Sequence, residues 1–329
     1  MSRVALLGAG GWGTALAAHL ARRDVEAVLW ARRAELAAEI SRRRENRYYL
    51  PGVLLPSGVR VEDDLAAAVE GCDFAVVTVP SHGVRELARR LGALEAALPP
   101  LLSAAKGLEE GSALRPTQVL AEELPAVPAG ALSGPNHAEE VGRGLPAATV
   151  VSAANAGLAR GFQQLLHSPT LRVYTSADLV GVELGGALKN VVALAVGIAA
   201  GLNLGDNAQA ALITRGLAEM RRLGVAMGAR AETFAGLSGL GDLVVTCGSS
   251  HSRNFRTGQE IGRGRPLEEI LAGTRMVVEG VRTTRAAVEL ARRVGVELPV
   301  AEAVHRILFE GELPARQVEC LMARRPREE

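Results

Sequence analysis

The sequence predicts an α/β fold in two parts, a doubly wound and mostly parallel sheet followed by an all-helical domain. Up to about Tyr174, short β-rich runs alternate with amphipathic helical patterns, which is typical of βαβ units with both sheet faces covered. Beyond that point, helical patterns continue without convincing strands. The length of 329 residues also fits two domains of about 100–200 residues each. Right-handed crossovers between parallel strands would complete the doubly wound sheet.

The expected elements follow this order along the chain. The strands are predicted at residues 4–7, 27–30, 74–79, 101–104, 131–133 and 148–152. The helices between them are predicted at residues 12–22, 36–43, 81–91 and 115–123. The helices of the second part are predicted at residues 180–202, 208–223, 254–261, 282–293 and 301–308. We place the boundary near Ser176, which gives domains 1–176 and 177–329, and expect them to share a ligand cleft, because ligand sites favour domain interfaces.

Charge and composition exclude several classes of protein. The 37 basic and 36 acidic residues leave a net charge of +1, so we expect neither nucleic acid nor an anionic membrane as a partner. Cys72, Cys247 and Cys320 are odd in number and lack a CxxC pair, which argues against a disulfide framework or a zinc site and fits a reducing cytoplasm.

Targeting and membrane segments are not expected. The first strand begins directly after Met1-Ser2-Arg3, which leaves no room for a signal peptide. The longest apolar stretch, residues 191–204, is shorter than the ~20 residues that cross a bilayer. We therefore predict a cytoplasmic protein without membrane insertion, with this stretch in a buried core helix.

A glycine-rich turn joins the first strand to the first helix. Gly8, Gly10 and Gly13 form a GxGxxG pattern in the strand–turn–helix context that dinucleotide binding requires. The first glycine permits the tight turn, the second lets the backbone approach a pyrophosphate, and the third allows close packing of the helix. The helix N-terminus offers free N–H groups to phosphate. The pattern favours a Rossmann-type NAD(P) domain over a simple glycine-rich turn.

The end of the second strand carries arginines where an acid would bind the ribose 2′-hydroxyl of NAD. Arg32 and Arg33 stand there, and the nearest acid, Glu35, falls inside the following helix. Arginines accommodate a 2′-phosphate, so NADP or dual use is favoured over strict NAD dependence. Ordinary surface arginines are the alternative.

Only two of the basic residues are lysines, Lys106 and Lys189. Arginine keeps its charge, whereas a partly buried lysine can give up a proton. Lys106 follows a strand, at the sheet edge that faces ligands. Lys189 follows Gly181, Gly185 and Gly186 in a helix, and because each glycine costs roughly 1 kcal/mol there, we expect that helix to approach a ligand or a neighbouring backbone closely. Codon bias explains the scarcity of lysine but not these positions.

Asp242 follows a glycine-rich turn, and Thr246 lies on the same face if the segment is helical. Apolar residues surround the aspartate, so a buried Asp242 needs a partner, and a lysine is the natural one. Helix N-capping is the alternative role for Asp242.

Ser252, Arg253 and Asn254 stand at a predicted helix N-terminus. A helix dipole, a guanidinium fork and an amide donor together suit a phosphate group. Ordinary capping by Ser252 is the alternative.

Taken together, these motifs resemble the bacterial NAD(P)-dependent sn-glycerol-3-phosphate dehydrogenase family over nearly the full length. The segments that carry the resemblance are residues 8–17, 103–108, 133–140, 185–190, 239–247, 252–254 and 278–281. The family fold would make the second domain similar to that of 6-phosphogluconate dehydrogenase. The chain departs from many relatives at Asn136-His137, where they have Ser and an aromatic residue, which leaves the roles of these two side chains open.

The resemblance implies reversible reduction of dihydroxyacetone phosphate to sn-glycerol 3-phosphate for glycerophospholipid synthesis, by a homodimer and without a metal. Lys189 would be the proton donor and acceptor, with Asp242 and Lys106 as further catalytic residues. The implied substrate-binding residues are Lys106, Gly134, Asn136, Lys189, Asn190, Asp242, Thr246, Ser252, Arg253 and Asn254. The implied cofactor-binding residues are Gly8, Gly10, Gly11, Trp12, Gly13, Arg32, Arg33, Lys106, Ala138, Arg253, Val277 and Glu279.

The residues themselves support the same chemistry. Negative charge builds on a carbonyl oxygen as hydride reaches its carbon, and an ammonium group stabilises that charge and supplies the proton. Lys189 would do both, with Asp242 orienting it and Lys106 adding to the field. Two alternatives stay open: another two-domain reductase, of the 3-hydroxyacid or 2-ketopantoate type, and a dinucleotide sensor without catalysis. The joint presence of Gly-Leu-Gly-Asp and Ser-Arg-Asn segments favours the first interpretation.

Overall fold

The computed structural model describes residues 2–94, 96–274 and 276–325. The chain divides into two compact units, which are described separately. The first unit comprises Met1–Lys106 and Leu114–Glu183, and the second comprises Gly107–Ala113 and Leu184–Glu329. The division therefore falls inside helix α8 (Leu179–Gly201), C-terminal to the boundary predicted between residues 176 and 177.

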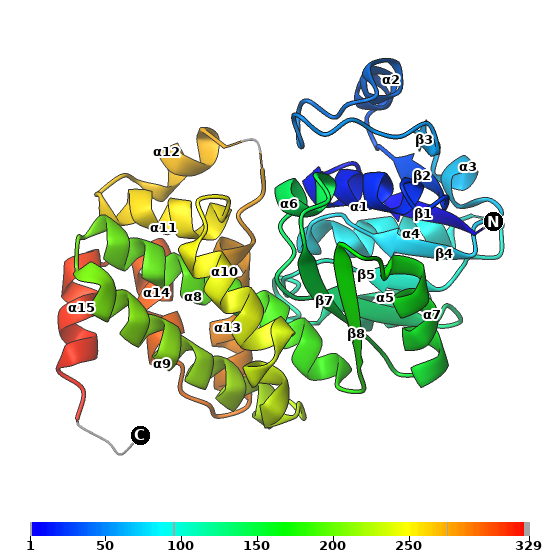
Figure 1. The fold of residues 1–329 in the computed structure, drawn as a ribbon. Coiled ribbons are helices and arrows are strands. Elements are labelled where there is room, and N and C mark those ends of the chain that lie inside the picture. Colours follow the sequence, from blue (N-terminus) through cyan, green and yellow to red (C-terminus); the bar gives the residue numbers. More distant parts are fainter. Residues whose placement is uncertain (1, 95, 275, 326–329) are drawn as a thin grey trace. The chain divides into compact units, whose positions relative to one another are not determined.

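The first unit is built on one sheet of eight strands (Figure 1). Its strands are β1 (Arg3–Leu7), β2 (Glu26–Trp30), β3 (Val59–Glu62), β4 (Phe74–Val77), β5 (Leu101–Ser103), β6 (Ala129–Ser133), β7 (Ala147–Ala153) and β8 (Leu171–Ser176). The strand order is β3-β2-β1-β4-β5-β6-β7-β8, and every neighbouring pair is parallel except β6 and β7. The predicted doubly wound, mostly parallel sheet is confirmed.

Helices cover both faces of this sheet, and the alternation of side chains along β1 shows how. Leu6 belongs to a core cluster with residues of α1, α2 and α7, whereas Leu7 belongs to a cluster with residues of α3, α4 and α5. Successive strand side chains point to opposite faces, so a strand that is buried on both sides reads as a continuous apolar run. The helices of this unit are α1 (Gly11–Ala21), α2 (Ala34–Arg43), α3 (Leu65–Val69), α4 (Val84–Gly92), α5 (Pro116–Glu123), α6 (Ala138–Gly142) and α7 (Ala156–Leu166).

Two strands escaped prediction, and both lie at an edge of the sheet. In β8, buried Leu171 and Val173 alternate with exposed Arg172 and Tyr174. An edge strand with one solvent face lacks the continuous apolar run that marked the central strands. The other edge strand, β3, is short and has a mixed burial pattern of the same kind.

The second unit contains helices and no strand among its described residues (Figure 1). Its helices are the C-terminal part of α8, then α9 (Gly205–Ala226), α10 (Asp242–Gly248), α11 (Arg253–Gly262), α12 (Leu267–Ala272), α13 (Glu279–Arg293), α14 (Pro299–Phe309) and α15 (Pro314–Met322). A 3-10 turn at Ala231–Ala235 (η2) and a π-helical turn at Leu237–Gly241 (η3) lead into α10. The sequence did not predict α10, α12 or α15 as helices.

Helix α8 matches the helix predicted at residues 180–202, and it begins well before the apolar stretch at residues 191–204. Among the described helices it alone has the length and composition of a membrane span, yet 89% of its most apolar window is buried inside the protein. A helix that is apolar on every side is the expected core helix of a large protein.

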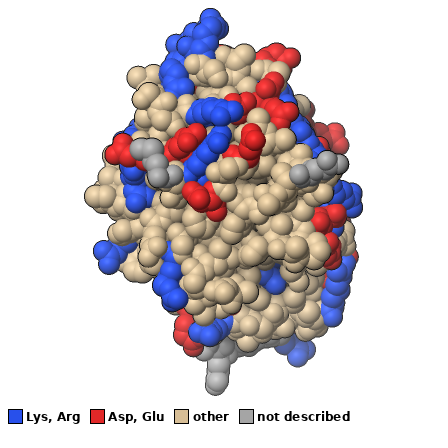
Figure 2. All heavy atoms as spheres, turned by 90° about the vertical axis from the view of Figure 1, so that its right-hand side faces the viewer, with Lys and Arg blue, Asp and Glu red and all other residues tan. Residues whose placement is uncertain are grey.

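The outer surface shown in Figure 2 mixes the two signs of charge. On the face shown, Lys and Arg side chains (blue) lie beside Asp and Glu side chains (red), and neither sign of charge forms a broad patch. Ion pairs of the first unit also place opposite charges side by side. Arg85, for example, binds both Glu122 and Glu123.

Candidate active site

The glycine-rich turn has the geometry that its sequence predicts. Gly8 has a φ of 134°, a conformation that favours glycine, and a Cβ atom at Gly13 would collide with the carbonyl oxygen of Gly8. A Cβ at Gly10 would meet nothing within 4 Å, so the backbone there is open to a ligand. The indole Nε1 of Trp12, in the first turn of α1, is buried without a hydrogen-bond partner. This turn fits a pyrophosphate group of a dinucleotide.

The end of β2 carries the two arginines, and Glu35 lies within α2 as expected. Arg32 forms an exposed ion pair with Glu86, with a nitrogen–oxygen distance of 3.7 Å. The guanidinium carbon of Arg33 lies 5.0 Å from the centre of the Tyr48 ring. This end of the strand therefore presents cations where a strictly NAD-dependent site would present an acid.

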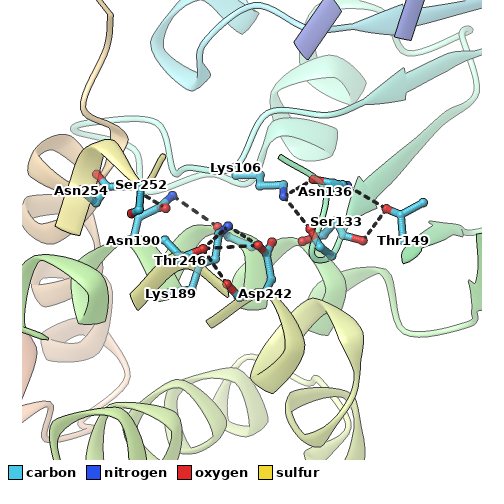
Figure 3. Close-up of polar contacts among 12 residues, drawn as sticks. Lys106, Ser133, Asn136, Thr149, Lys189, Asn190, Asp242, Thr246, Ser252 and Asn254 are labelled. Carbon is cyan, nitrogen blue, oxygen red and sulfur yellow. Dashed lines mark hydrogen bonds and ion pairs between the residues drawn. The ribbon is translucent and has the colours of Figure 1, made fainter. Parts of the chain in front are cut away.

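Lys106 and two predicted partners form one polar cluster of the first unit (Figure 3). Its ammonium donates to the carbonyl oxygen of Gly134 at 2.9 Å and to Oδ1 of Asn136 at 2.7 Å. The amide of Asn136 donates in turn to Thr149 Oγ1 at 2.9 Å, which fixes which side of the amide faces the lysine. Thr149 was not predicted, because its position on β7 reads as an ordinary buried strand residue.

Lys189 and Asp242 form the central polar cluster of the second unit (Figure 3). The two side chains are an ion pair, although Lys189 is only 6% and Asp242 only 1% exposed. The ammonium also donates to Thr246 Oγ1 at 2.9 Å, and that hydroxyl donates to the backbone carbonyl of Asp242. The expected shared face of Asp242 and Thr246 and the lysine partner of Asp242 are both found. Buried charges persist when they are paired and hydrogen-bonded in this way.

Close packing of α8 against the turn before α10 explains why residue 185, inside a helix, is a glycine. A Cβ atom at Gly185 would lie 2.5 Å from the carbonyl oxygen of Ser238, in the π-helical turn η3. Only glycine allows the two backbones to pack this closely, as expected for this helix. Lys189 lies one turn further along α8, on the same face, so the close packing brings its side chain to the start of α10.

The Ser-Arg-Asn segment begins α11, and its side chains have partners within the second unit. Ser252 Oγ accepts a hydrogen bond from the backbone N–H of Phe255, so it caps the helix as the simpler alternative expected. Asn254 donates to Asn190 Oδ1 at 2.8 Å and accepts from the backbone N–H of Gly280 at 2.9 Å. This network joins α8, α11 and α13 through two of the predicted substrate residues.

The remaining predicted cofactor residues fall into two groups. In the first unit, Ala138 begins α6, and its Cβ lies 3.6 Å from a Cβ placed at Gly11 in the glycine-rich turn. In the second unit, the carbonyl oxygen of Val277 accepts from Arg253 at 2.7 Å, and Glu279 begins α13. The cleft that we expect the domains to share stays a prediction.

Family models match both parts of the chain. The model described as NAD-dependent glycerol-3-phosphate dehydrogenase N-terminus matches residues 3–159, and that of the C-terminus of the same enzyme matches residues 178–319. The chain belongs to the NAD-dependent glycerol-3-phosphate dehydrogenase family. The resemblance drawn from the sequence motifs is thereby confirmed.

Individual members of this family align over almost the whole chain. The glycerol-3-phosphate dehydrogenase [NAD(P)+] of Pelotomaculum thermopropionicum is 52% identical over 325 residues, which cover 98% of this chain and 93% of that protein. The Moorella thermoacetica enzyme of the same name is 52% identical, with 98% and 96% covered. The crystal structure of glycerol-3-phosphate dehydrogenase from Coxiella burnetii superposes with a TM-score of 0.94 at 40% identity, covering 98% of this chain and 99% of that one.

Likeness outside the glycerol-3-phosphate dehydrogenase family concerns the fold alone. A ketopantoate reductase from Ralstonia eutropha has a TM-score of 0.62 at 17% identity, covering 96% of this chain and 99% of that one. The alternative of a 2-ketopantoate-type reductase is therefore supported by a shared architecture, at a sequence identity of 17%.

Proposed function

We propose that this chain catalyses the reversible NAD(P)H-dependent reduction of dihydroxyacetone phosphate to sn-glycerol 3-phosphate, with Lys189 as proton donor and acceptor. The observation that carries the residue assignment is the buried cluster of Lys189, Asp242 and Thr246. Burying a lysine ammonium is unfavourable unless the site uses or compensates its charge. The reaction itself is proposed because the chain belongs to the NAD-dependent glycerol-3-phosphate dehydrogenase family.

The glycine-rich turn and the start of α1 are the part of the chain that fits the dinucleotide. The residues that would hold it are Gly8, Gly10, Gly11, Trp12, Gly13, Arg32, Arg33, Lys106, Ala138, Arg253, Val277 and Glu279. When bound, the reduced nicotinamide supplies a hydride to the carbonyl carbon of the substrate.

Lys189 completes the reduction at the carbonyl oxygen. As negative charge develops there, the ammonium stabilises it and transfers one proton, so that the carbonyl becomes a secondary alcohol and the lysine becomes neutral. Asp242 holds the charged lysine in place, and Thr246 accepts a second hydrogen bond from the ammonium, so two partners orient the Lys189 side chain. In the reverse direction, the neutral lysine accepts the proton of the alcohol. A proton from solvent restores the ammonium between turnovers.

The other polar clusters bind rather than transfer protons. Lys106, held by Gly134 and Asn136, would contribute a fixed positive charge toward the substrate. Arg253 and Asn254, at the capped N-terminus of α11, would bind the phosphate group through a guanidinium and an amide together with the helix dipole.

Several finer assignments belong to the same proposal. Arg32 and Arg33 favour NADP or dual use over strict NAD dependence. We also propose domains 1–176 for the dinucleotide and 177–329 for the substrate, a homodimer, a cytoplasmic location and a role in glycerophospholipid synthesis. The odd, unpaired cysteines support the reducing location.

Steady-state kinetics with each dinucleotide tests the reaction. Oxidation of NADPH and NADH is followed at 340 nm with dihydroxyacetone phosphate, 2-ketopantoate and a 3-oxoacid as substrates. We expect turnover with dihydroxyacetone phosphate alone. Turnover with one of the other substrates but not with dihydroxyacetone phosphate would overturn the assignment, and dinucleotide binding without any turnover would support a sensor.

Lys→Arg variants separate the two lysines. Lys189→Arg keeps a charge but removes a transferable proton, so kcat should fall by orders of magnitude. Lys106→Arg should raise KM for the substrate more than it lowers kcat. If both variants change the same parameter, the separate roles are wrong.

A further inference from the structure

Asn46 is a fully buried side chain that lies between the glycine-rich turn and a segment rich in tyrosine. Its exposed fraction is 0%. The amide nitrogen donates to the carbonyl oxygen of Ala9 at 2.9 Å and to Thr14 Oγ1 at 2.8 Å. The amide oxygen accepts from the backbone N–H of Tyr49 at 3.1 Å. Both donors and the acceptor of one buried amide are thus used, and they join three separate points of the chain.

These bonds fix the dinucleotide turn itself. Ala9 is the residue between Gly8 and Gly10, and Thr14 lies in the first turns of α1, where its hydroxyl donates to the carbonyl oxygen of Gly10 at 2.8 Å. Asn46 therefore holds both the turn and the start of the helix, through the carbonyl oxygen of Ala9 and the hydroxyl of Thr14.

The same residue fixes the segment that follows it. The backbone N–H of Leu50 donates to the Asn46 carbonyl oxygen at 2.8 Å, which closes one turn around Tyr48 and Tyr49. A Cβ atom placed at Gly11 would lie 3.0 Å from the carbonyl oxygen of Tyr49. The tyrosine segment is therefore packed directly against the start of α1.

Arg33 lies on these two tyrosines. Its guanidinium carbon is 5.0 Å from the Tyr48 ring centre and 6.0 Å from that of Tyr49, and Nη2 is 3.5 Å from the Tyr49 hydroxyl. The two rings meet edge to face at 4.6 Å. An exposed arginine is otherwise free to sample many rotamers, and stacking on aromatic rings restricts it while preserving its charge.

We infer that Asn46 is a positioning residue for dinucleotide selectivity, which ties the Tyr48-Tyr49 platform to the glycine-rich turn and thereby sets Arg33 for a ribose 2′-phosphate. This inference rests on the proposed role of Arg33. An amide is required because only it supplies two donors and one acceptor; an aspartate would place a carboxylate against the Ala9 carbonyl oxygen.

Equilibrium binding of NADPH and NADH, measured by protein or dinucleotide fluorescence without substrate, tests the inference. The quantity of interest is the ratio of the Kd for NADH to the Kd for NADPH. We expect Asn46→Ala to lower this ratio by about fivefold or more, because the 2′-phosphate contact depends on a held arginine. Arg33→Ala should lower it at least as far, and the double variant no further than Arg33→Ala alone.

A second variant and a matched control separate positioning from stability. Tyr48→Leu removes the exposed aromatic face without touching the buried amide, so it should fold and should lower the ratio even if Asn46→Ala does not fold. Asn155→Ala removes another asparagine of the same unit, which caps α7 through the backbone N–H groups of Gly157 and Leu158. It should lower thermal stability and leave the ratio unchanged.

Three outcomes would contradict the inference in different ways. If Asn46→Ala weakens both dinucleotides equally, Asn46 supports only the pyrophosphate turn. If Arg33→Ala lowers the ratio but Asn46→Ala and Tyr48→Leu do not, the positioning role is wrong and the proposed role of Arg33 stands. If Arg33→Ala leaves the ratio unchanged, the proposed role of Arg33 fails, and the inference fails with it.

Discussion

Lys189 and Asp242 form a buried ion pair between the middle of α8 and the first residue of α10. The close contact of Gly185 with Ser238 places the two elements side by side, and Thr246 adds a hydroxyl to the same ammonium. The carboxylate and the hydroxyl together hold this ammonium group in one orientation. Directional donors of this kind, aimed at developing charge, account for much of the catalytic effect of enzyme sites.

Replacing Asp242 with asparagine keeps the shape of the pair and removes its charge. We expect kcat to fall by about 10²–10⁴-fold, because Lys189 loses the group that orients it and balances its charge. The Kd for NADPH, which depends on the glycine-rich turn, should change less than about twofold. The matched control is Asp178→Asn, since Asp178 accepts from the backbone N–H of Gly181 near the start of α8, and asparagine caps equally well. An unchanged kcat in Asp242→Asn would refute the orienting role.

Replacing Thr246 should lower kcat less than replacing Asp242 does, and a conservative variant should restore the activity. Thr246→Val removes the hydroxyl that accepts from Lys189, and loss of this charged hydrogen bond should lower kcat by about tenfold. Thr246→Ser restores the hydroxyl and should recover most of the loss. If valine and serine variants behave alike, the methyl packing of Thr246 matters rather than its hydroxyl.

The cysteines should react in an order set by burial. Cys320 is exposed, whereas Cys247, one residue after Thr246, is buried, and burial raises the pKa of its thiol to about 12. Burial also raises the pKa of the half-buried Cys72 thiol, to about 11. Because the thiolate is the reactive form, iodoacetamide at pH 8 should label Cys320 first and Cys247 last.

Peptide mass spectrometry over a time course measures this order. The protein unfolded in guanidinium is the control, and there the three thiols should react at similar rates. Rapid labelling of Cys247 in the folded protein would show that the core beside Lys189 opens far more readily than its packing indicates.

The parts of the fold that sequence could predict were those with a local signature. The central strands are continuous apolar runs and the glycine-rich turn has its own spacing, so both were found. The edge strand β8 alternates between core and solvent, and α7 carries Gly157 and Gly161 within a short helix, which weakens its helical signal. Both were missed.

Among the site residues, too, some could be predicted from the sequence and others could not. The pairing of Asp242 with a lysine followed from chemistry, because a carboxylate among apolar residues requires a cation. Asn46 and Thr149 act through bonds to residues distant in sequence, such as Ala9 and Asn136. No local pattern marks such a loop asparagine or strand threonine as a connection of this kind, and the folded structure is needed to reveal it.

Glu219 provides a prediction about stability that is independent of catalysis. It lies on α9, is only 7% exposed, and accepts from the backbone N–H groups of Val300 at 2.7 Å and Ala301 at 3.2 Å, in the first turn of α14. Burial raises its pKa from an ordinary 4.5 to about 7, against the lowering effect of those two N–H groups and of Arg222, while the nearby Glu302 adds to the rise.

The folded state therefore binds this proton more tightly than the unfolded state does. Stability from Glu219 is fully present below pH 4.5 and is lost as the pH rises to about 7, because a buried carboxylate must then carry its charge. Glu219→Gln mimics the protonated form. Between pH 5 and pH 8, the wild-type free energy of unfolding should fall relative to that of this variant by about 2 kcal/mol. Guanidinium unfolding at both pH values measures the difference, with Glu289→Gln, at an exposed ion pair with Arg293, as the control that should show none. A constant difference between wild type and Glu219→Gln across this range would mean that Glu219 keeps its charge in the fold, stabilised by the α14 N-terminus more strongly than burial opposes it.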